Sequence, residues 1–158
     1  MVSGAFRQRM CFRHWGEYEI MFIHLNTHSV YSPMRGLLSL SDLMNLSQSH
    51  GMDTLALTDV NGMWGFIRFV QHCKDAGISP IAGTNLITEN DDVILLAENQ
   101  YGYENMCRAV SAVHDNSKQS ITDILEKQLA GLFVLSHKES TLNKLINIIP
   151  YTHLFLEL

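Results

Sequence analysis

Histidine and carboxylate side chains follow several short apolar segments of this chain, at positions where strands would end. His24 and His28 follow the first such segment, and Asp59 follows the second. Imidazole and carboxylate groups together bind zinc or manganese and activate water, as in a multinuclear metal hydrolase. Two histidines and one aspartate are too few for such a centre, but His137, after a later segment, and Glu157, within the last one, are further candidates.

These side chains depend for their position on short apolar runs that alternate with amphipathic patterns from Met21 onward. In one such pattern Phe66, Phe69 and Cys73 form an apolar stripe, which predicts a helix that ends at Gly77. The predicted strands are 22–25, 54–57, 78–82, 93–97, 132–135 and 154–158, and the predicted helices lie near 39–50, 66–76, 103–113 and 142–149, with a short one after residue 120.

Strand and helix in repeated order predict the α/β class, with parallel strands and right-handed crossovers. Both a barrel and a doubly wound sheet fit this order, and we favour the barrel. A complete barrel takes about 250 residues. Since the chain supplies about six strands, we expect residues 21–158 to form one α/β domain, truncated at its C-terminal end. Residues 1–20 are expected to be a leader, either a disordered, transit-like or surface segment, or an artefact of the start site.

The composition excludes several classes of protein. The formal net charge of -5 provides no positive field for a phosphate backbone. No apolar run reaches the roughly 18 to 20 residues of a membrane span, and the start lacks the apolar core of a secretory signal. Three cysteines without a CxxC pair indicate neither a disulfide framework nor a zinc finger. We therefore expect a cytoplasmic chain that has no membrane partner and contacts DNA only through other parts.

Six segments, in order, match the motifs of one protein family. The stretch HLNTHSVYS, from His24 to Ser32, resembles the opening motif of the PHP (polymerase and histidinol phosphatase) domain of bacterial DNA polymerase III alpha subunits, replicative or error-prone. The stretch LALTDVNG, from Leu55 to Gly62, resembles the second motif. The remaining matches are 76–83, 95–99, 131–136 and 155–158, so that the resemblance covers nearly everything from residue 21 to the end.

The resemblance implies a PHP-type distorted (β/α)7 TIM-like barrel with a trinuclear metal site, here incomplete and degenerate. Metal-binding relatives have histidine where this chain has Asn26 and Val60, and glutamate where it has Asn85. A histidine ahead of the fourth strand corresponds to Asp92. Amides are weak zinc ligands and valine binds no metal, so the ligand set departs from the family pattern at these positions.

The remaining candidates are open to two interpretations, and none is assigned a catalytic role. In the first, His24, His28, Asp59, Glu157 and His137 are a vestigial metal site. In the second, which we favour, His24, His28 and Asp59 form hydrogen bonds that organise loops at the barrel mouth, because a lone His or Asp more often satisfies backbone groups than binds a metal.

For function, the resemblance implies the N-terminal PHP domain of a DNA-directed DNA polymerase (a nucleotidyltransferase) of replication or error-prone repair synthesis. We expect this segment to be a non-catalytic structural and subunit-docking module without a cofactor, while magnesium serves the parent polymerase. Its expected partners are the remainder of the alpha subunit and, as in some members of the family, a proofreading exonuclease subunit. The alternative is a metal-dependent phosphoesterase or 3′–5′ proofreading exonuclease with zinc or manganese, against which Asn26, Val60 and Asn85 argue.

Overall fold

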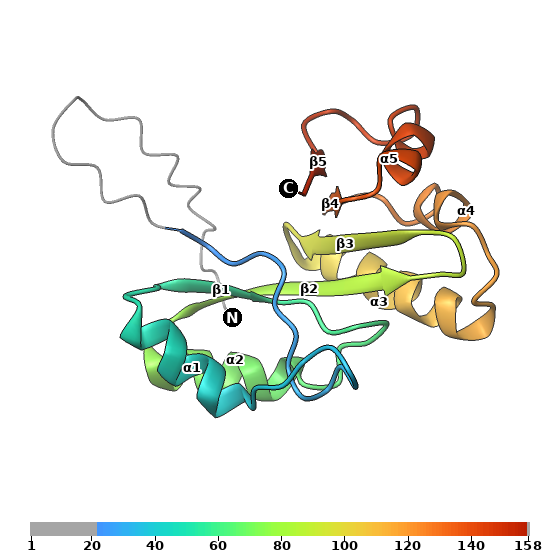
Figure 1. Cartoon of the computed structure of the whole chain (residues 1–158). Helices are drawn as coiled ribbons and strands as arrows, with labels where there is room; N and C mark the ends of the chain where they lie inside the picture. The colour runs from blue at the N-terminus through green and yellow to red at the C-terminus, as the bar shows by residue number, and fades with distance from the viewer. Residues whose placement is uncertain (1–21, 158) are drawn as a thin grey trace, which may run out of the picture.

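The computed structural model describes residues 22–157, in which five helices and five strands follow one another (Figure 1). The predicted leader, residues 1–20, lies outside the described residues. The helices are α1 (Leu40–Ser49), α2 (Phe66–Ala76), α3 (Gln100–Asp115), α4 (Ile121–Leu125) and α5 (Glu139–Leu145). The strands are β1 (Thr54–Leu57), β2 (Ser79–Ile87), β3 (Asp92–Ala97), β4 (Leu132–Ser136) and β5 (Leu154–Leu156).

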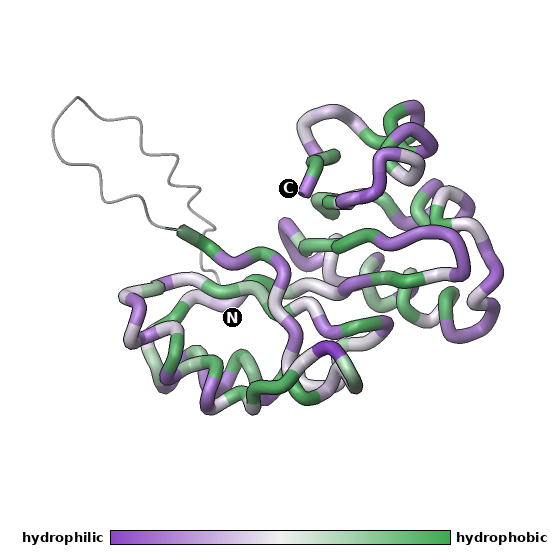
Figure 2. The backbone as a smooth tube through the Cα atoms, in the orientation of Figure 1, coloured by the Kyte–Doolittle hydropathy of each residue, from purple (hydrophilic) through white to green (hydrophobic). Residues whose placement is uncertain are grey.

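The sequence at the ends of the three longest helices explains where they begin and end. Helix α1 begins after Ser39, whose hydroxyl accepts a hydrogen bond from the N–H of Asp42 at 3.2 Å. Helix α2 ends at Gly77, which has a φ of 72°. Helix α3 begins after Asn99, whose side chain accepts from the N–H of Gly102 at 3.1 Å. Hydropathy alternates along these helices (Figure 2), and none within residues 22–157 is long and apolar enough to cross a membrane.

The five strands form one sheet in the order β1-β2-β3-β4-β5. Strands β1 and β2 are parallel, as are β4 and β5, whereas β3 is antiparallel to both of its neighbours. The α/β class is confirmed, but the prediction of parallel strands throughout is wrong. Only residues 88–91 connect β2 to β3, and a parallel crossover needs a dozen residues or more, so this connection is a hairpin.

The first predicted strand, residues 22–25, is not a strand in the structure, which therefore has five strands where about six were expected. This segment nevertheless runs beside β1. The N–H of Ala56 donates to the carbonyl of His24 at 3.1 Å, and the N–H of Thr58 donates to the carbonyl of Thr27 at 2.8 Å. Residues 24–27, called here the first segment, thus occupy the place of a strand without a strand's regular pairing.

Strand β3 separates two apolar clusters, because all six of its residues are buried and successive side chains point to opposite faces. Val93 and Leu95 pack with residues of α3, α4 and α5, whereas Ile94 and Leu96 join side chains on the other face. Helices thus cover one face of the sheet, and the inner face borders a cavity of about 580 Å³. Its apolar lining includes Leu25, Ile81, Leu96, Phe133, Leu135 and Phe155.

The sheet curls, because its two ends come into contact. The side-chain amide of Asn26, in the first segment, donates to Oε1 of Glu157, just after β5, at 2.7 Å. Neighbouring strands lie about 4.8 Å apart, so five intervals in a flat sheet would separate these chain segments by roughly 24 Å. The observed contact therefore requires strong curvature, and the fold is a partial, distorted barrel of the TIM type with its helices outside.

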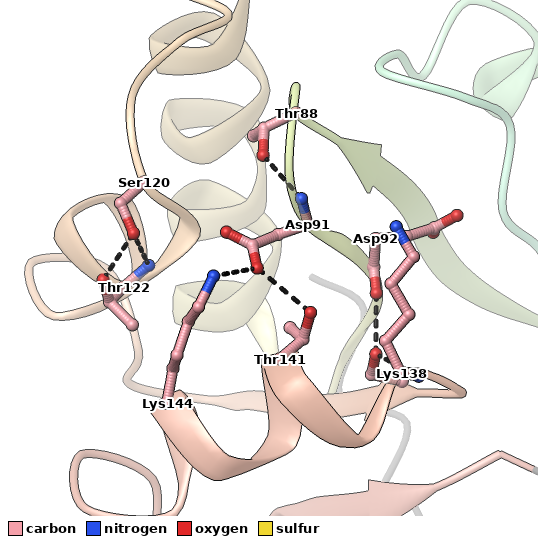
Figure 3. Close-up of polar contacts among 9 residues, drawn as sticks. Thr88, Asp91, Asp92, Ser120, Thr122, Lys138, Thr141 and Lys144 are labelled. Atoms are coloured by element: carbon pink, nitrogen blue, oxygen red, sulfur yellow. Dashed lines mark hydrogen bonds and ion pairs between the residues drawn. The ribbon is translucent and has the colours of Figure 1, made fainter.

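An ion pair between a buried carboxylate and a partly exposed ammonium group attaches helix α5 to the turn between β2 and β3 (Figure 3). Asp91, which is 1% exposed, accepts hydrogen bonds from Nζ of Lys144 at 2.7 Å and from Oγ1 of Thr141 at 3.0 Å. Burial by itself raises the pKa of Asp91, but these two hydrogen bonds and the ammonium charge of Lys144 outweigh burial and lower the pKa.

The stability contributed by Asp91 should therefore depend on pH in the acid range. Its folded-state pKa is depressed, so the ion pair stabilises the fold above the unfolded value of about 3.9 and this contribution is lost as pH falls through the folded pKa. Asp91→Asn should lower the free energy of unfolding at neutral pH by about 1–2 kcal/mol, a figure reduced because Lys144 is partly exposed. Urea unfolding at acid and neutral pH would measure both effects. The free energy of unfolding of Asp91→Asn should decrease less steeply than that of the wild type as the pH falls. The control Asp75→Asn, at an exposed position, should follow the wild type. Identical pH dependence in all three proteins would contradict the role assigned to Asp91.

Candidate functional site

Several chain ends meet at one edge of the sheet, called here the mouth. Strands β1, β2, β4 and β5 run in the same direction, so their C-terminal ends meet there, and the reversed strand β3 contributes its first residue, Asp92. The candidate residues predicted from the sequence come from several of these chain ends. His24 and Asn26 lie in the first segment, and His28 directly follows it. The others are Asp59 and Val60 after β1, Asn85 in β2, His137 after β4 and Glu157 after β5.

Asp59 lies at the centre of a hydrogen-bond network. It is 1% exposed, and its Oδ1 accepts from the N–H of Ser29 at 2.8 Å and from the hydroxyl of Ser32 at 2.6 Å. Its Oδ2 accepts from the hydroxyl of Ser29 at 2.8 Å. Ser32 in turn accepts from the N–H of Val60 at 2.9 Å. The carboxylate thus holds the loop after His28 against the end of β1.

The sequence alone assigned no partner to Ser29 or Ser32. The available signal was their spacing: two serines three residues apart follow a strand-like segment, and a single aspartate follows the next one. A buried carboxylate needs several donors, because burying an isolated charge is costly. Serine hydroxyls and backbone N–H groups in a neighbouring loop are the simplest source of such donors.

The two histidines of the first motif differ in environment. His28 is half-buried, and its Nε2 is shielded from solvent without a hydrogen-bond partner among residues 22–157. Burial lowers the pKa of His28 despite the nearby Asp59 carboxylate, and the Arg35 guanidinium lowers it further. His24 is exposed, and its ring packs edge-on against Phe22 with centroids 4.7 Å apart. Burial therefore favours the neutral imidazole of His28 at the mouth, whereas His24 lies at its rim.

Two positions that depart from the family's metal pattern carry amides, and each donates to a carboxylate. Asn26 donates to Glu157 at 2.7 Å, and its Oδ1 accepts from the hydroxyl of Thr58 at 3.3 Å. Asn85 donates to Oδ1 of Asp92 at 2.6 Å. The Oδ1 of Asn85 is buried and has no partner within the described residues. A neutral amide thus donates to one carboxylate oxygen of Glu157 and to one of Asp92.

The remaining two positions add no ligand to this group. Val60 is half-buried and bridges to Asn85 through the backbone, but its alkyl side chain cannot bind a metal. His137 is exposed, and its side chain forms no hydrogen bond or ion pair with any residue from 22 to 157. The structure therefore does not bring His137 together with Asp59 and His28.

The donor set at the mouth does not fit a metal centre. In the part of the chain that the structure describes, no three His, Cys, Asp or Glu side chains lie close enough together to hold a metal ion. The Asp59 carboxylate already accepts three hydrogen bonds, and two ligand positions carry amides that donate to carboxylates. What this arrangement can do chemically is hold loops and chain ends together.

Comparison with known proteins gives consistent matches. The family model described as the PHP domain matches residues 24–154. The chain is 42% identical to an error-prone DNA polymerase of Symbiobacterium thermophilum over 94 residues, 59% of this chain, and 35% identical to the DNA polymerase III subunit alpha of Bacillus subtilis over 104 residues, 61% of this chain. It spans 9% of the length of each polymerase. An amidohydrolase structure from Chromobacterium violaceum aligns with a TM-score of 0.48 at 18% identity, covering 59% of this chain and 33% of that one.

The matched region runs from His24 to Leu154, and so contains both the first segment and all five strands except the last two residues of β5. This extent exceeds half of the 158 residues. It includes the polar positions of the mouth from His24 through His137. The chain therefore belongs to the PHP domain family, and it is homologous to the part of DNA polymerase III alpha subunits and error-prone DNA polymerases that carries this domain.

Proposed function

We propose that this PHP domain is a non-catalytic structural and subunit-docking module of a DNA polymerase III alpha subunit. The observation that supports this most strongly is the state of Asp59, whose carboxylate accepts three hydrogen bonds from Ser29 and Ser32. Three of the roughly four acceptor sites of this carboxylate are occupied, two on Oδ1 and one on Oδ2. A metal bound through Oδ1, or through both oxygens, would have to displace a donor and leave a buried N–H or hydroxyl group without a partner, which costs about 1–3 kcal/mol for each group. Asp59 is therefore better suited to structure than to ligation.

The same chemistry argues against activation of a water molecule at the mouth. Hydrolysis by zinc or manganese needs several ligands that hold the ion and an open position for water. Here the positions of Asn26, Val60 and Asn85 provide two amides and one alkyl group. Within the described residues, the imidazole of His28 belongs to no group of three or more His, Cys, Asp or Glu side chains that could hold a metal ion. These substitutions argue against the phosphoesterase and exonuclease alternative and against a zinc or manganese cofactor.

The apolar inner face supports the docking part of the proposal. On β5 the side chains of Phe155 and Leu156 are 45% and 56% exposed, and β5 pairs only with β4 among the described strands. Exposed apolar side chains beside an apolar cavity are suited to receive another polypeptide segment. We assign this surface to the remainder of the alpha subunit, with a proofreading exonuclease subunit as a further partner of the assembly.

Several consequences belong to the same proposal. DNA is contacted through the parent polymerase, because this chain carries a net charge of -5 and lacks a positive field for phosphates. Polymerisation and its magnesium ions reside in other parts of that polymerase. A role in bacterial replication or error-prone repair synthesis places the chain in the cytoplasm.

Metal content tests the non-catalytic part of the proposal. The chain would be purified without chelator, its metals measured by elemental analysis, and hydrolysis of bis(p-nitrophenyl) phosphate followed with added manganese or zinc. We expect less than one tightly held ion per chain and no turnover. Two or more ions per chain, with turnover that is lost in His28→Gln and retained in the control His50→Gln, would overturn the proposal and establish a hydrolase.

Co-expression with the remainder of the alpha subunit tests the docking part. The two polypeptides should co-elute in size-exclusion chromatography. Phe155→Asp should reduce co-elution, because it places a charge on the exposed apolar surface of β5. The control Tyr151→Asp alters a residue that is 88% exposed and outside the lining of the cavity, and it should have no effect. Separate elution of the wild-type chain, or equal loss with both variants, would contradict docking at this surface.

A further inference from the structure

The curled sheet leaves a seam between the first segment and β5. Within residues 22–157 no backbone hydrogen bond joins these two chain segments, although Leu25 and Phe155 both line the same cavity. The polar contact across the seam is the hydrogen bond from the Asn26 side chain to Glu157, at 2.7 Å over a sequence separation of 131 residues. Among the hydrogen bonds of residues 22–157, this is the one that joins the two sides of the seam.

The direction of the Asn26 amide is consistent on both of its sides. Thr58, which is fully buried, lies with its hydroxyl 3.3 Å from Oδ1 of Asn26 and 3.1 Å from the carbonyl of Thr27, and the same hydroxyl accepts from the N–H of Thr27 at 2.8 Å. The single hydroxyl proton has two acceptors within reach, so Thr58 restrains Asn26 only weakly. The carboxylate of Glu157 can only accept, so the NH2 group of Asn26 must face it.

Glu157 is held from its own side as well. Its backbone N–H donates to the carbonyl of Ser136, the last residue of β4, at 3.0 Å. The contacts therefore form a chain from Thr58 at the end of β1, through Asn26 and Glu157, to Ser136 at the end of β4. Thr58, Ser136 and Glu157 lie at the C-terminal end of a strand or directly beyond it, and Asn26 lies in the first segment.

We propose that Asn26 and Glu157 form a latch that closes the seam of the partial barrel without a metal ion. An ionised carboxylate that accepts from an amide forms a charge-assisted hydrogen bond, which is stronger than a neutral one. It joins the first segment to β5, as a shared metal ion could if both positions carried ligands. This inference concerns the closure of the fold and does not depend on the docking role.

Exchange of donor and acceptor provides the test. N26D places two carboxylates in the latch and removes its N–H donor. E157Q keeps an acceptor oxygen but removes the charge. The double variant N26D/E157Q reverses the polarity, since the new glutamine amide can donate to the new aspartate, and its net charge equals that of the wild type. Asn45→Asp, at an exposed position of α1 with no hydrogen bond from its side chain to the described residues, is the matched control.

Amide hydrogen exchange measured by NMR on the full chain gives the readout at both ends of the latch. In N26D the amides of residues 58 and 157 should exchange about five- to tenfold faster, in E157Q about two- to threefold faster, and in the double variant within about twofold of the wild type. Asn45→Asp should leave both rates unchanged.

If Asn26 had only a local role, N26D would accelerate amide exchange at residue 58 and leave the rate at residue 157 unchanged. That outcome would overturn the latch. An unrescued double variant would overturn it as well. Should N26D fail to fold, the double variant still decides, because a folded double variant supports the latch and an unfolded one contradicts it.

Discussion

Replacing Asp59 by alanine is expected to lower the free energy of unfolding by about 3–5 kcal/mol. The substitution removes a carboxylate that is 1% exposed and leaves the N–H of Ser29 and the hydroxyls of Ser29 and Ser32 without their acceptor. Unsatisfied buried donors are more costly than the hydrogen bonds that they replace are favourable. Urea unfolding followed by circular dichroism at neutral pH would measure the change.

Two further variants distinguish the effect of losing the hydrogen-bond network from the effect of losing a negative charge. Asp75→Ala removes an exposed carboxylate at the end of α2, and it should change stability by less than about 0.5 kcal/mol. Asp59→Asn keeps the shape but substitutes a donor for one acceptor oxygen, so its effect should lie between the other two. A loss below about 1 kcal/mol for Asp59→Ala would contradict the network described here.

Gly102→Ala is the second substitution for which we expect a large loss of stability, about 3 kcal/mol, corresponding to a decrease in melting temperature of about 6–12 °C. A Cβ atom at residue 102 would overlap the carbonyl oxygen of Gly131 and lie 2.6 Å from its carbonyl carbon. Backbone atoms cannot rotate away as a side chain can. The start of helix α3 would have to shift, and the hydrogen bond from the Gly102 N–H to Asn99 would be strained or lost.

Differential scanning calorimetry of the variant and the wild type would measure this effect. Gln100→Ala, in the same helical turn but exposed, is the control and should shift the midpoint by no more than about 2 °C. An unchanged midpoint for Gly102→Ala would mean that α3 does not pack against the loop at Gly131 in the way that the structure has it.

Elements whose boundaries depend on local chemistry were predictable. Ser39 and Gly77 mark helix ends through capping and positive φ, which need only neighbouring residues. The direction of β3 was not predicted, because an apolar run has the same pattern in parallel and antiparallel pairing. The sequence between β2 and β3 has no helical pattern, and this was the one indication in the sequence that the two strands are antiparallel.

In the candidate site, too, features that depend on residue type were predictable, and features that depend on the folded chain were not. That Asn26 and Asn85 are weaker ligands than imidazole or carboxylate is predicted from residue type alone. Their hydrogen-bond partners, Glu157 and Asp92, could not be predicted from residue type, because side-chain direction and the curvature of the sheet decide those contacts. His137 shows the converse: a position after a strand placed it near the mouth, but its side chain is exposed and takes no part in the network.

The contact between Asn26 and Glu157 imposes an order of events during synthesis of the chain. At a translation rate of 5–20 residues per second, the 131 residues between them take roughly 7 to 26 s to emerge after Asn26. Helices α1 and α2 with β1 can form their own apolar cluster in that interval, because all of its buried members lie between Leu40 and Ile78. The first half of the nascent chain can therefore form a core of its own on the ribosome, while the seam stays open until the end of β5 has been made.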